Sequence, residues 1–198
     1  MRTGWRNLWD SSKTRVVEFL IAPEYSYMHK SSLRFICNIS EGIEALSNGL
    51  EKKTTWGNGE LIEMRNKHEK IYGQKQEWGP GAITETVRSL VPRDTVITMD
   101  SGAHRILISQ AWRTYVPRSA LQSSAFCTMG CALPLATGAK LADPGRVVVA
   151  FMGDGGLEMV LGELITLRDL GLPVIVMVFV DASLALIEKK QREMQYKN

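Results

Sequence analysis

Two carboxylates, each placed directly after a short apolar run, are the residues of this 198-residue chain best suited to chemistry. Asp154 follows the run 147–152, within Gly153-Asp154-Gly155-Gly156, and Asp181 follows the run 174–180. Continuous apolar runs of this length are typical of strands buried on both faces of a parallel sheet. Because the carboxyl ends of parallel strands lie at one edge of the sheet, we expect both carboxylates there, holding a metal ion beside a phosphate.

The glycines around Asp154 let the backbone turn sharply and approach a ligand closely. Apolar residues at helical spacing then predict a helix over 157–170, beginning just after the glycines and ended by Gly171. Backbone N–H groups at its start would hold a diphosphate. A dinucleotide fingerprint would need glycine at Glu158, and the Gly-Lys-Ser or Gly-Lys-Thr ending of a P-loop is absent. A plain strand-to-helix turn at 153–156 is the alternative interpretation.

Strands and helices alternate from Gly79 onward, which predicts an α/β fold with a doubly wound, mostly parallel sheet. Pro80 opens a helix to Leu90, and a strand is expected over 95–99. Residues 1–53 predict a fragment of a second α/β domain, with apolar runs at 16–22 and 33–39 and a helix capped by Ser40. Residues 54–78 are rich in Lys, Glu, Gln and Gly, which indicates a solvated helix or linker.

Several of these motifs together resemble one enzyme family. Gly153-Asp154-Gly155, with 25 residues before Asp181, resembles the thiamine diphosphate motif, which runs from Gly-Asp-Gly to Asn-Asn; the final pair is Val180-Asp181 here. The surroundings resemble the diphosphate-binding domain of the acetolactate synthase family, in Met129-Gly130-Cys131-Ala132-Leu133-Pro134, Glu163-Leu164 and Gly171-Leu172-Pro173-Val174. The resemblance covers roughly 79–195 and implies a thiamine diphosphate-binding domain over 79–198, after the end of a middle domain at 1–53.

The resemblance implies two cofactors, thiamine diphosphate and Mg²⁺. The Mg²⁺ ligands would be the side chains of Asp154 and Asp181 and the main-chain oxygen of Ser183. Further contacts to the cofactor are implied at Gly153, Gly155, Gly156, Ser183 and Leu184, and at Ala103 and His104 in the turn after the strand 95–99. An alternative for His104 is a side chain that is merely hydrogen-bonded in a strand-to-helix turn.

Met129 lies 25 residues before Asp154, where the family places a bulky residue under the cofactor that bends it. Cys127, Thr128 and Met129 would contact the cofactor, with the Cys127 carbonyl accepting from the aminopyrimidine and the Met129 amide donating to it. The family usually has glycine where Cys127 stands, so this substitution is tolerable if the local φ is negative. Alternatively, Met129 only starts a packed helix.

By the same resemblance, the chain belongs to a lyase or transferase that decarboxylates a 2-oxo acid and passes the product to an acceptor. The acid that activates the cofactor in this family is a glutamate on a separate pyrimidine-binding domain. We expect no catalytic residue in this chain, no activity from the chain alone, and a homodimer or a partner chain that supplies this domain. The alternatives are a non-catalytic cofactor-binding or interaction module, and a 2-oxo acid decarboxylase or related carbon–carbon lyase.

Composition excludes other classes of function. The net charge is +3, and no basic block with interleaved aromatic residues occurs, so we expect no nucleic-acid partner. The longest apolar run, 172–180, is too short to span a bilayer, and the amino terminus lacks the apolar core of a signal peptide, which predicts a cytoplasmic protein without a membrane partner. Three cysteines without zinc-ligand spacing fit a reducing compartment.

Overall fold

The structure is a computed structural model, and it divides the chain into two compact units, residues 1–58 and 59–198, which are described separately. It describes residues 9–10, 12–23, 31–51, 56–57, 59–72, 78–124 and 126–196. The segment predicted as a linker therefore includes positions outside the described residues, namely 54–55, 58 and 73–77. None of the helices in the described ranges is long and apolar enough to cross a membrane.

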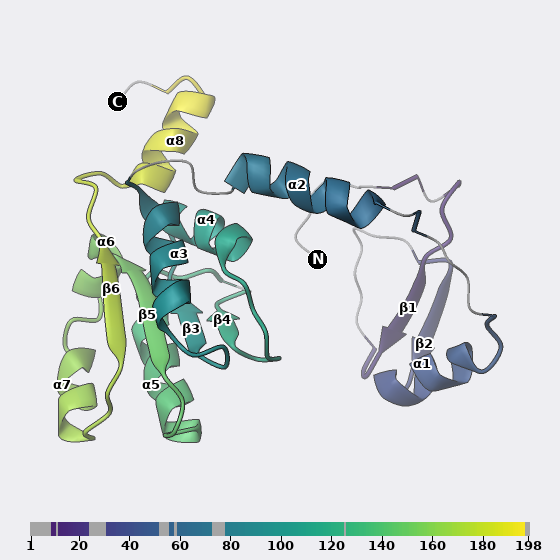
Figure 1. Ribbon diagram of the computed structural model, residues 1–198, viewed down its shortest axis with the longest axis horizontal. Coiled ribbons are helices and arrows are strands. Elements are labelled where there is room, and N and C mark those ends of the chain that lie inside the picture. Colours follow the sequence, from purple (N-terminus) through teal and green to yellow (C-terminus); the bar gives the residue numbers. More distant parts are fainter. Residues whose placement is uncertain are drawn as a thin grey trace. The chain divides into compact units, whose positions relative to one another are not determined.

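The first unit contains two parallel strands and one helix: β1 (Val17–Leu20), β2 (Leu33–Ile36) and α1 (Ile39–Ser47) (Figure 1). The rings of Phe19 and Phe35, at paired positions of the two strands, stack with centroids 5.3 Å apart. The prediction that Ser40 caps the helix is wrong. Asn38 is the cap, because its Oδ1 accepts a hydrogen bond from the Ser40 N–H at 3.0 Å.

The second unit is an α/β fold built on four parallel strands in the order β4-β3-β5-β6, which confirms the predicted fold class (Figure 1). The strands are β3 (Val96–Met99), β4 (Ala120–Gln122), β5 (Val148–Gly153) and β6 (Ile175–Phe179). The helices are α2 (Glu60–Tyr72), α3 (Pro80–Leu90), α4 (Ala103–Ala111), α5 (Ala132–Ala142), α6 (Asp154–Glu158), α7 (Glu163–Asp169) and α8 (Ala185–Glu193).

Alternate residues of β5 divide the core between the two faces of the sheet, because successive side chains of a strand point in opposite directions. Val148, Ala150 and Met152 are buried against α5 and α7, whereas Val149 and Phe151 are buried against α4. With helices covering both faces, the middle strands have no solvent-facing side, which explains why their sequences are continuously apolar.

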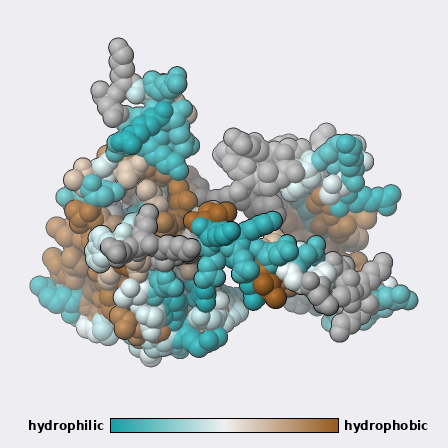
Figure 2. All heavy atoms as spheres, turned by 45° about the horizontal axis from the view of Figure 1, so that its top comes forward, coloured by the Kyte–Doolittle hydropathy of each residue, from teal (hydrophilic) through white to brown (hydrophobic). Residues whose placement is uncertain are grey.

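The outer surface of the second unit is uneven in polarity. Figure 2 shows hydrophilic side chains gathered on α8 and apolar side chains, in brown, over the outer side of β6 and α7. The apolar group consists of exposed residues of these elements and the turn before α7: Met159, Leu161, Leu164, Ile165, Leu170 and Ile175.

The predicted single helix over 157–170 is wrong. The first helix, α6, starts at Asp154 itself and ends at Glu158, residues 159–162 form turns, and α7 starts at Glu163. Val160 lies in these turns and packs against the core. Leu157 and Leu167 also pack in this core, whereas Leu161, Leu164 and Ile165 are exposed, so the apolar spacing arises from a mixture of core and surface side chains and not from one helix face. Gly162, a poor helix former, occupies the position before α7.

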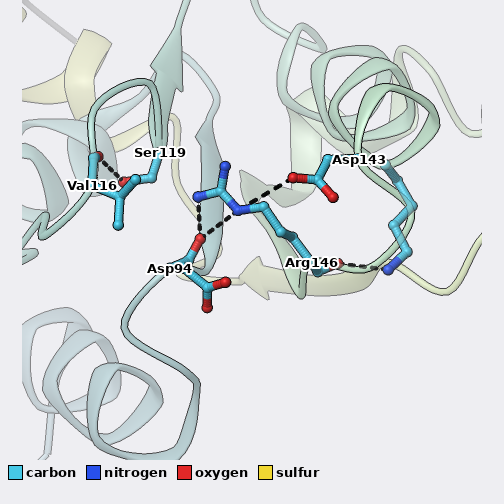
Figure 3. A network of polar contacts seen from close by, with 6 residues as sticks. Asp94, Val116, Ser119, Asp143 and Arg146 are labelled. Carbon is cyan, nitrogen blue, oxygen red and sulfur yellow. Dashed lines mark hydrogen bonds and ion pairs between the residues drawn. The ribbon is translucent and has the colours of Figure 1, made fainter.

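Polar contacts fix the sheet at the amino ends of β3 and β5, opposite to the edge where Asp154 lies. Figure 3 shows the Arg146 guanidinium pointing at the main-chain carbonyl of Asp94, with Nε 2.7 Å from that oxygen and 3.9 Å from the Asp143 carboxylate. The Lys140 ammonium donates to the Arg146 carbonyl at 2.6 Å. These contacts join the end of α5 to the segments that enter both strands.

Candidate functional site

A cavity of about 680 Å³ opens at the carboxyl ends of β3, β5 and β6. Its walls come from the turn after β3, the start of α4, the loops after β5 and β6, and the residues that begin α3. Most of the predicted site residues line it: Ala103, His104, Met129, Gly153, Asp154, Gly155, Gly156, Asp181, Ser183 and Leu184. Cys127 and Thr128 do not belong to its lining, and their contacts stay predictions.

The two predicted metal ligands come from the ends of adjacent strands. β5 and β6 pair in parallel with Gly153 opposite Phe179, so Asp154 and Asp181 follow the same end of the pair. The Asp154 Oδ1 accepts from the Gly155 N–H at 2.9 Å, and the Asp181 Oδ1 accepts from the Ser183 N–H at 3.1 Å. Each carboxylate is thus oriented by one backbone amide and keeps further lone pairs for a ligand.

This donor set fits Mg²⁺ bound together with a diphosphate. Among the described residues there is no group of three or more His, Cys, Asp or Glu side chains that could hold a metal alone. Mg²⁺ needs fewer protein ligands when it bridges phosphates, because it takes one or two carboxylates and completes its shell with phosphate oxygens and water.

His104 is buried at the floor of the cavity, with 9% of its surface exposed. Its ring stacks on Phe179 with centroids 5.3 Å apart, and its buried Nε2 has no hydrogen-bond partner in the described parts of the chain. Burial lowers the pKa of His104 below its usual value, and the nearby Asp100 carboxylate opposes that effect. The imidazole is therefore neutral near pH 7 and offers one nitrogen that a ligand could satisfy.

The close packing of the His104 ring requires glycine at the strand end. A Cβ on Gly102 would lie 2.6 Å from the His104 Cε1, and Gly102 has a φ of +155°, which side-chain-bearing residues rarely adopt.

Met129 lies in a turn that lines the cavity, near Gly155. Its methyl carbon, Cε, would be 3.3 Å from a Cβ placed on Gly155, so glycine at this position leaves room for it. The alternative in which Met129 starts a helix is wrong, because α5 begins at Ala132 with Cys131 as its cap. Met129 is therefore held by the loop and is free to face the cavity.

The condition set for Cys127 is not met. Its φ is +52°, in the left-handed region that favours glycine, whereas the substitution was expected to be tolerable with a negative φ. The Ser123 hydroxyl oxygen accepts a hydrogen bond from the Cys127 N–H at 3.1 Å. A cysteine here keeps a backbone conformation that is unfavourable for its own side chain.

Asp100 is the main residue of this region that sequence reasoning missed. It follows the buried strand β3 just as Asp154 and Asp181 follow theirs, so the same signal was available. Its fully buried carboxylate accepts hydrogen bonds from the Gly130 and Cys131 amides. The apolar wall of the cavity was also missed: Trp78, Ile83, Leu107, Val178, Phe179 and Leu186.

Comparison with known proteins agrees with this geometry. The family model "Thiamine pyrophosphate enzyme, C-terminal TPP binding domain" matches residues 100–198. The chain is 36% identical over 109 residues to the acetolactate synthase isozyme 1 large subunit of Escherichia coli, covering 55% of this chain and 19% of that one. It is 35% identical over 112 residues to acetolactate synthase of Bacillus subtilis, covering 57% and 20%.

A longer match, 29% identical over 153 residues, is to the acetolactate synthase large subunit of Buchnera aphidicola from Schizaphis graminum, covering 67% of this chain and 27% of that one. The chain thus spans about a fifth to a quarter of the length of these relatives. Because the family model covers half of the chain and includes most of the cavity lining, the chain belongs to the thiamine pyrophosphate-dependent enzymes and contains their C-terminal TPP-binding domain, in an acetolactate synthase-like form.

Proposed function

We propose that this chain supplies the magnesium and thiamine diphosphate site of an acetolactate synthase-like enzyme that decarboxylates a 2-oxo acid and joins the product to an acceptor. Asp154 and Asp181 carry this proposal, because they follow adjacent strands and line one cavity with His104 and Met129. The relatives named above are acetolactate synthases, which supports this choice of reaction.

Asp154, Asp181 and the main-chain oxygen of Ser183 would hold Mg²⁺, and the metal would neutralise the diphosphate. The acidic side chain of Asp181, where the family has asparagine, adds a negative charge to this set. The unpartnered Nε2 of neutral His104 is suited to a hydrogen bond with the diphosphate, together with the backbone of the turn at Ala103.

The apolar lining would receive the rings of the cofactor, with Met129 beneath them as a prop. Bound thiamine diphosphate supplies the carbon chemistry. The chain's part is to bind the cofactor, bend it over Met129 and exclude water from it. The Cys127 carbonyl and the Met129 amide would fix the aminopyrimidine, and Thr128 and Leu184 would add contacts.

The rim of the cavity favours an assembly in which a second domain covers the site. Four apolar side chains that line the cavity are more than half exposed: Trp78 at 80%, Val180 at 73%, Leu184 at 57% and Ile187 at 52%. A homodimer or a partner chain with a pyrimidine-binding domain would bury them and supply the activating glutamate. The same exposed rim also fits the second candidate, a module that binds the cofactor without turnover.

Titration calorimetry with thiamine diphosphate, in the presence and absence of Mg²⁺, tests the binding function. Asp154→Ala should abolish the magnesium-dependent part of the affinity, because it removes one of the two carboxylates that would hold Mg²⁺ against the diphosphate. Asp181→Asn should bind normally, since it restores the family's ligand. Asp169→Ala, which removes an exposed carboxylate beside Arg168, is the matched control. Unchanged affinity in Asp154→Ala would refute the metal assignment.

Turnover separates the two candidates. The chain alone should release no measurable carbon dioxide from pyruvate, and addition of a pyrimidine-binding partner should produce activity if the chain is part of an enzyme. Cofactor binding without turnover in the completed assembly would favour the non-catalytic module.

A further inference from the structure

The Asp100 carboxylate lies where two neighbouring loops that line the cavity meet, the turn at Met129 and the loop 153–156. Its Oδ1 accepts from the Cys131 N–H at 3.0 Å, and its Oδ2 accepts from the Gly130 N–H at 2.9 Å. The side chain is fully buried, and its own N–H donates to the Phe151 carbonyl of β5 at 2.9 Å. Asp100 therefore holds the turn that follows Met129 through its carboxylate, and it is itself held to β5 through its main-chain N–H.

The second loop packs on the same carboxylate. A Cβ placed on Gly156 would lie 1.9 Å from the Asp100 Oδ2, a distance that no real contact permits. The Gly130 nitrogen, whose N–H donates a hydrogen bond to this oxygen, would lie 3.5 Å from the same Cβ. Glycine at 156 thus lets the loop after β5 approach Asp100, and the Met129 turn and the Gly153–Gly156 loop meet at one buried point.

We infer that Asp100 is a positioning residue of the cofactor site: it sets the height of Met129 above the loop that carries Asp154. This inference rests on the proposed function. The Met129 Cε lies 3.3 Å from the place where a Cβ on Gly155 would stand, so a shift of the turn after Met129 changes the space left between this side chain and the diphosphate loop. Two further contacts hold this segment from β3, a hydrogen bond from the Thr98 hydroxyl to the Ala132 carbonyl and one from the Cys131 thiol to the Met99 carbonyl.

The role requires a carboxylate rather than a side chain of the same shape. Asparagine has one oxygen acceptor and one NH₂ donor, so in Asp100→Asn the donor would face one of the two amide N–H groups. That amide would be buried without an acceptor, and the turn would move to relieve the clash of donors. The volume of the residue is nearly unchanged, so the substitution perturbs the position of Met129 without emptying the core.

Two ligands separate the two parts of the site in calorimetry with the full chain. Inorganic pyrophosphate with Mg²⁺ needs only the loop at 153–156 and Asp181, whereas thiamine diphosphate also needs Met129. In Asp100→Asn we expect the affinity for thiamine diphosphate to fall roughly tenfold or more, with the affinity for pyrophosphate within about twofold of the original chain. Amide hydrogen exchange should show loss of protection at Gly130 and Cys131 in the same variant.

Two control variants exclude trivial causes. Asp94→Asn makes the same acid-to-amide change on an exposed residue at the other end of β3. Asp94 contacts Arg146 through its main-chain carbonyl, which the substitution keeps (Figure 3), so neither affinity should change. Ile108→Val removes one methyl group from the buried core of α4, and a general loss of stability of this kind should weaken both ligands together.

The outcomes are distinct. Equal affinities for thiamine diphosphate in Asp100→Asn and the original chain, or parallel losses for both ligands as in Ile108→Val, overturn the positioning role alone. Absence of magnesium-dependent binding of either ligand by the original chain overturns the proposed function and the positioning role with it.

Discussion

Replacing Cys127 with glycine should stabilise the protein, although glycine usually weakens a fold. Cys127 has a φ of +52°, and an L-residue held in this left-handed conformation costs roughly 1 to 2 kcal/mol. Glycine removes this cost but loses more backbone entropy on folding, about 0.4 to 1 kcal/mol relative to alanine. The balance favours glycine over alanine at this position by about 0.5 to 1 kcal/mol, which corresponds to roughly 1 to 4 °C in Tm for a chain of this size.

The comparison of Cys127→Gly with Cys127→Ala isolates the backbone effect, because both variants lose the thiol. Cys131 supplies the control, since it has an ordinary φ of −76° at the start of α5. There, Cys131→Gly should be less stable than Cys131→Ala by about 0.5 to 1 kcal/mol. Urea unfolding followed by tryptophan fluorescence measures all four variants. If alanine is equal to or better than glycine at 127, the left-handed backbone inferred here is refuted.

The remaining predictions concern His104, Met129 and Arg146. Burial lowers the pKa of His104 below its usual value of 6.5, so at a pH under 6.5 the unfolded chain binds a proton that the folded chain does not. The free energy of unfolding should therefore fall with acidification by up to about 1.4 kcal/mol per pH unit. Urea unfolding at about pH 7.5 and 5.5 should show this slope, and His104→Gln should flatten it. In the completed enzyme, Met129→Ala should lower turnover by up to about a hundredfold, because about 1 Å of misplacement has that effect, and should lower affinity for thiamine diphosphate less, by about tenfold. A loss of stability with unchanged turnover per folded site would mean that Met129 only packs. Arg146→Met should lose about 1 to 3 kcal/mol of unfolding free energy, because its guanidinium contact with the Asp94 carbonyl is removed, yet calorimetry should find cofactor affinity unchanged.

The strands and the edge that carries the site were predictable because their signals are local. The run 147–152 became β5, which is covered on both faces and therefore apolar along its length, and the run 174–180 became β6, whose side chains are half-buried or exposed although the sequence predicted a strand buried on both faces. The parallel pairing of those strands then places Asp154 and Asp181 together, which the order of elements already predicted. The resemblance added Met129, which no spacing alone identifies as a prop.

The features that were missed depend on contacts between distant parts of the chain or on backbone angles. Asp100 acts through amides 30 and 31 residues away, a pairing that the sequence around Asp100 does not encode. The break between α6 and α7 escaped notice because Val160, in the turn, is still packed against the core and keeps the apolar rhythm of a helix. The sign of φ at Cys127 could only be stated as a condition, because the residue type does not fix the backbone angle, and the left-handed φ shows that the condition fails.

The outer position of β6 affects how the purified chain behaves in solution. β6 ends the strand order β4-β3-β5-β6, so within the described residues the backbone groups on its far side face no further strand. An open edge of this kind is a template for sheet growth from one molecule to the next, and the apolar surface beside it in Figure 2 strengthens that tendency. Aggregation at high protein concentration is the hazard that follows. A single charged substitution at the start of the strand, Ile175→Lys, would oppose it at a position that does not line the cavity.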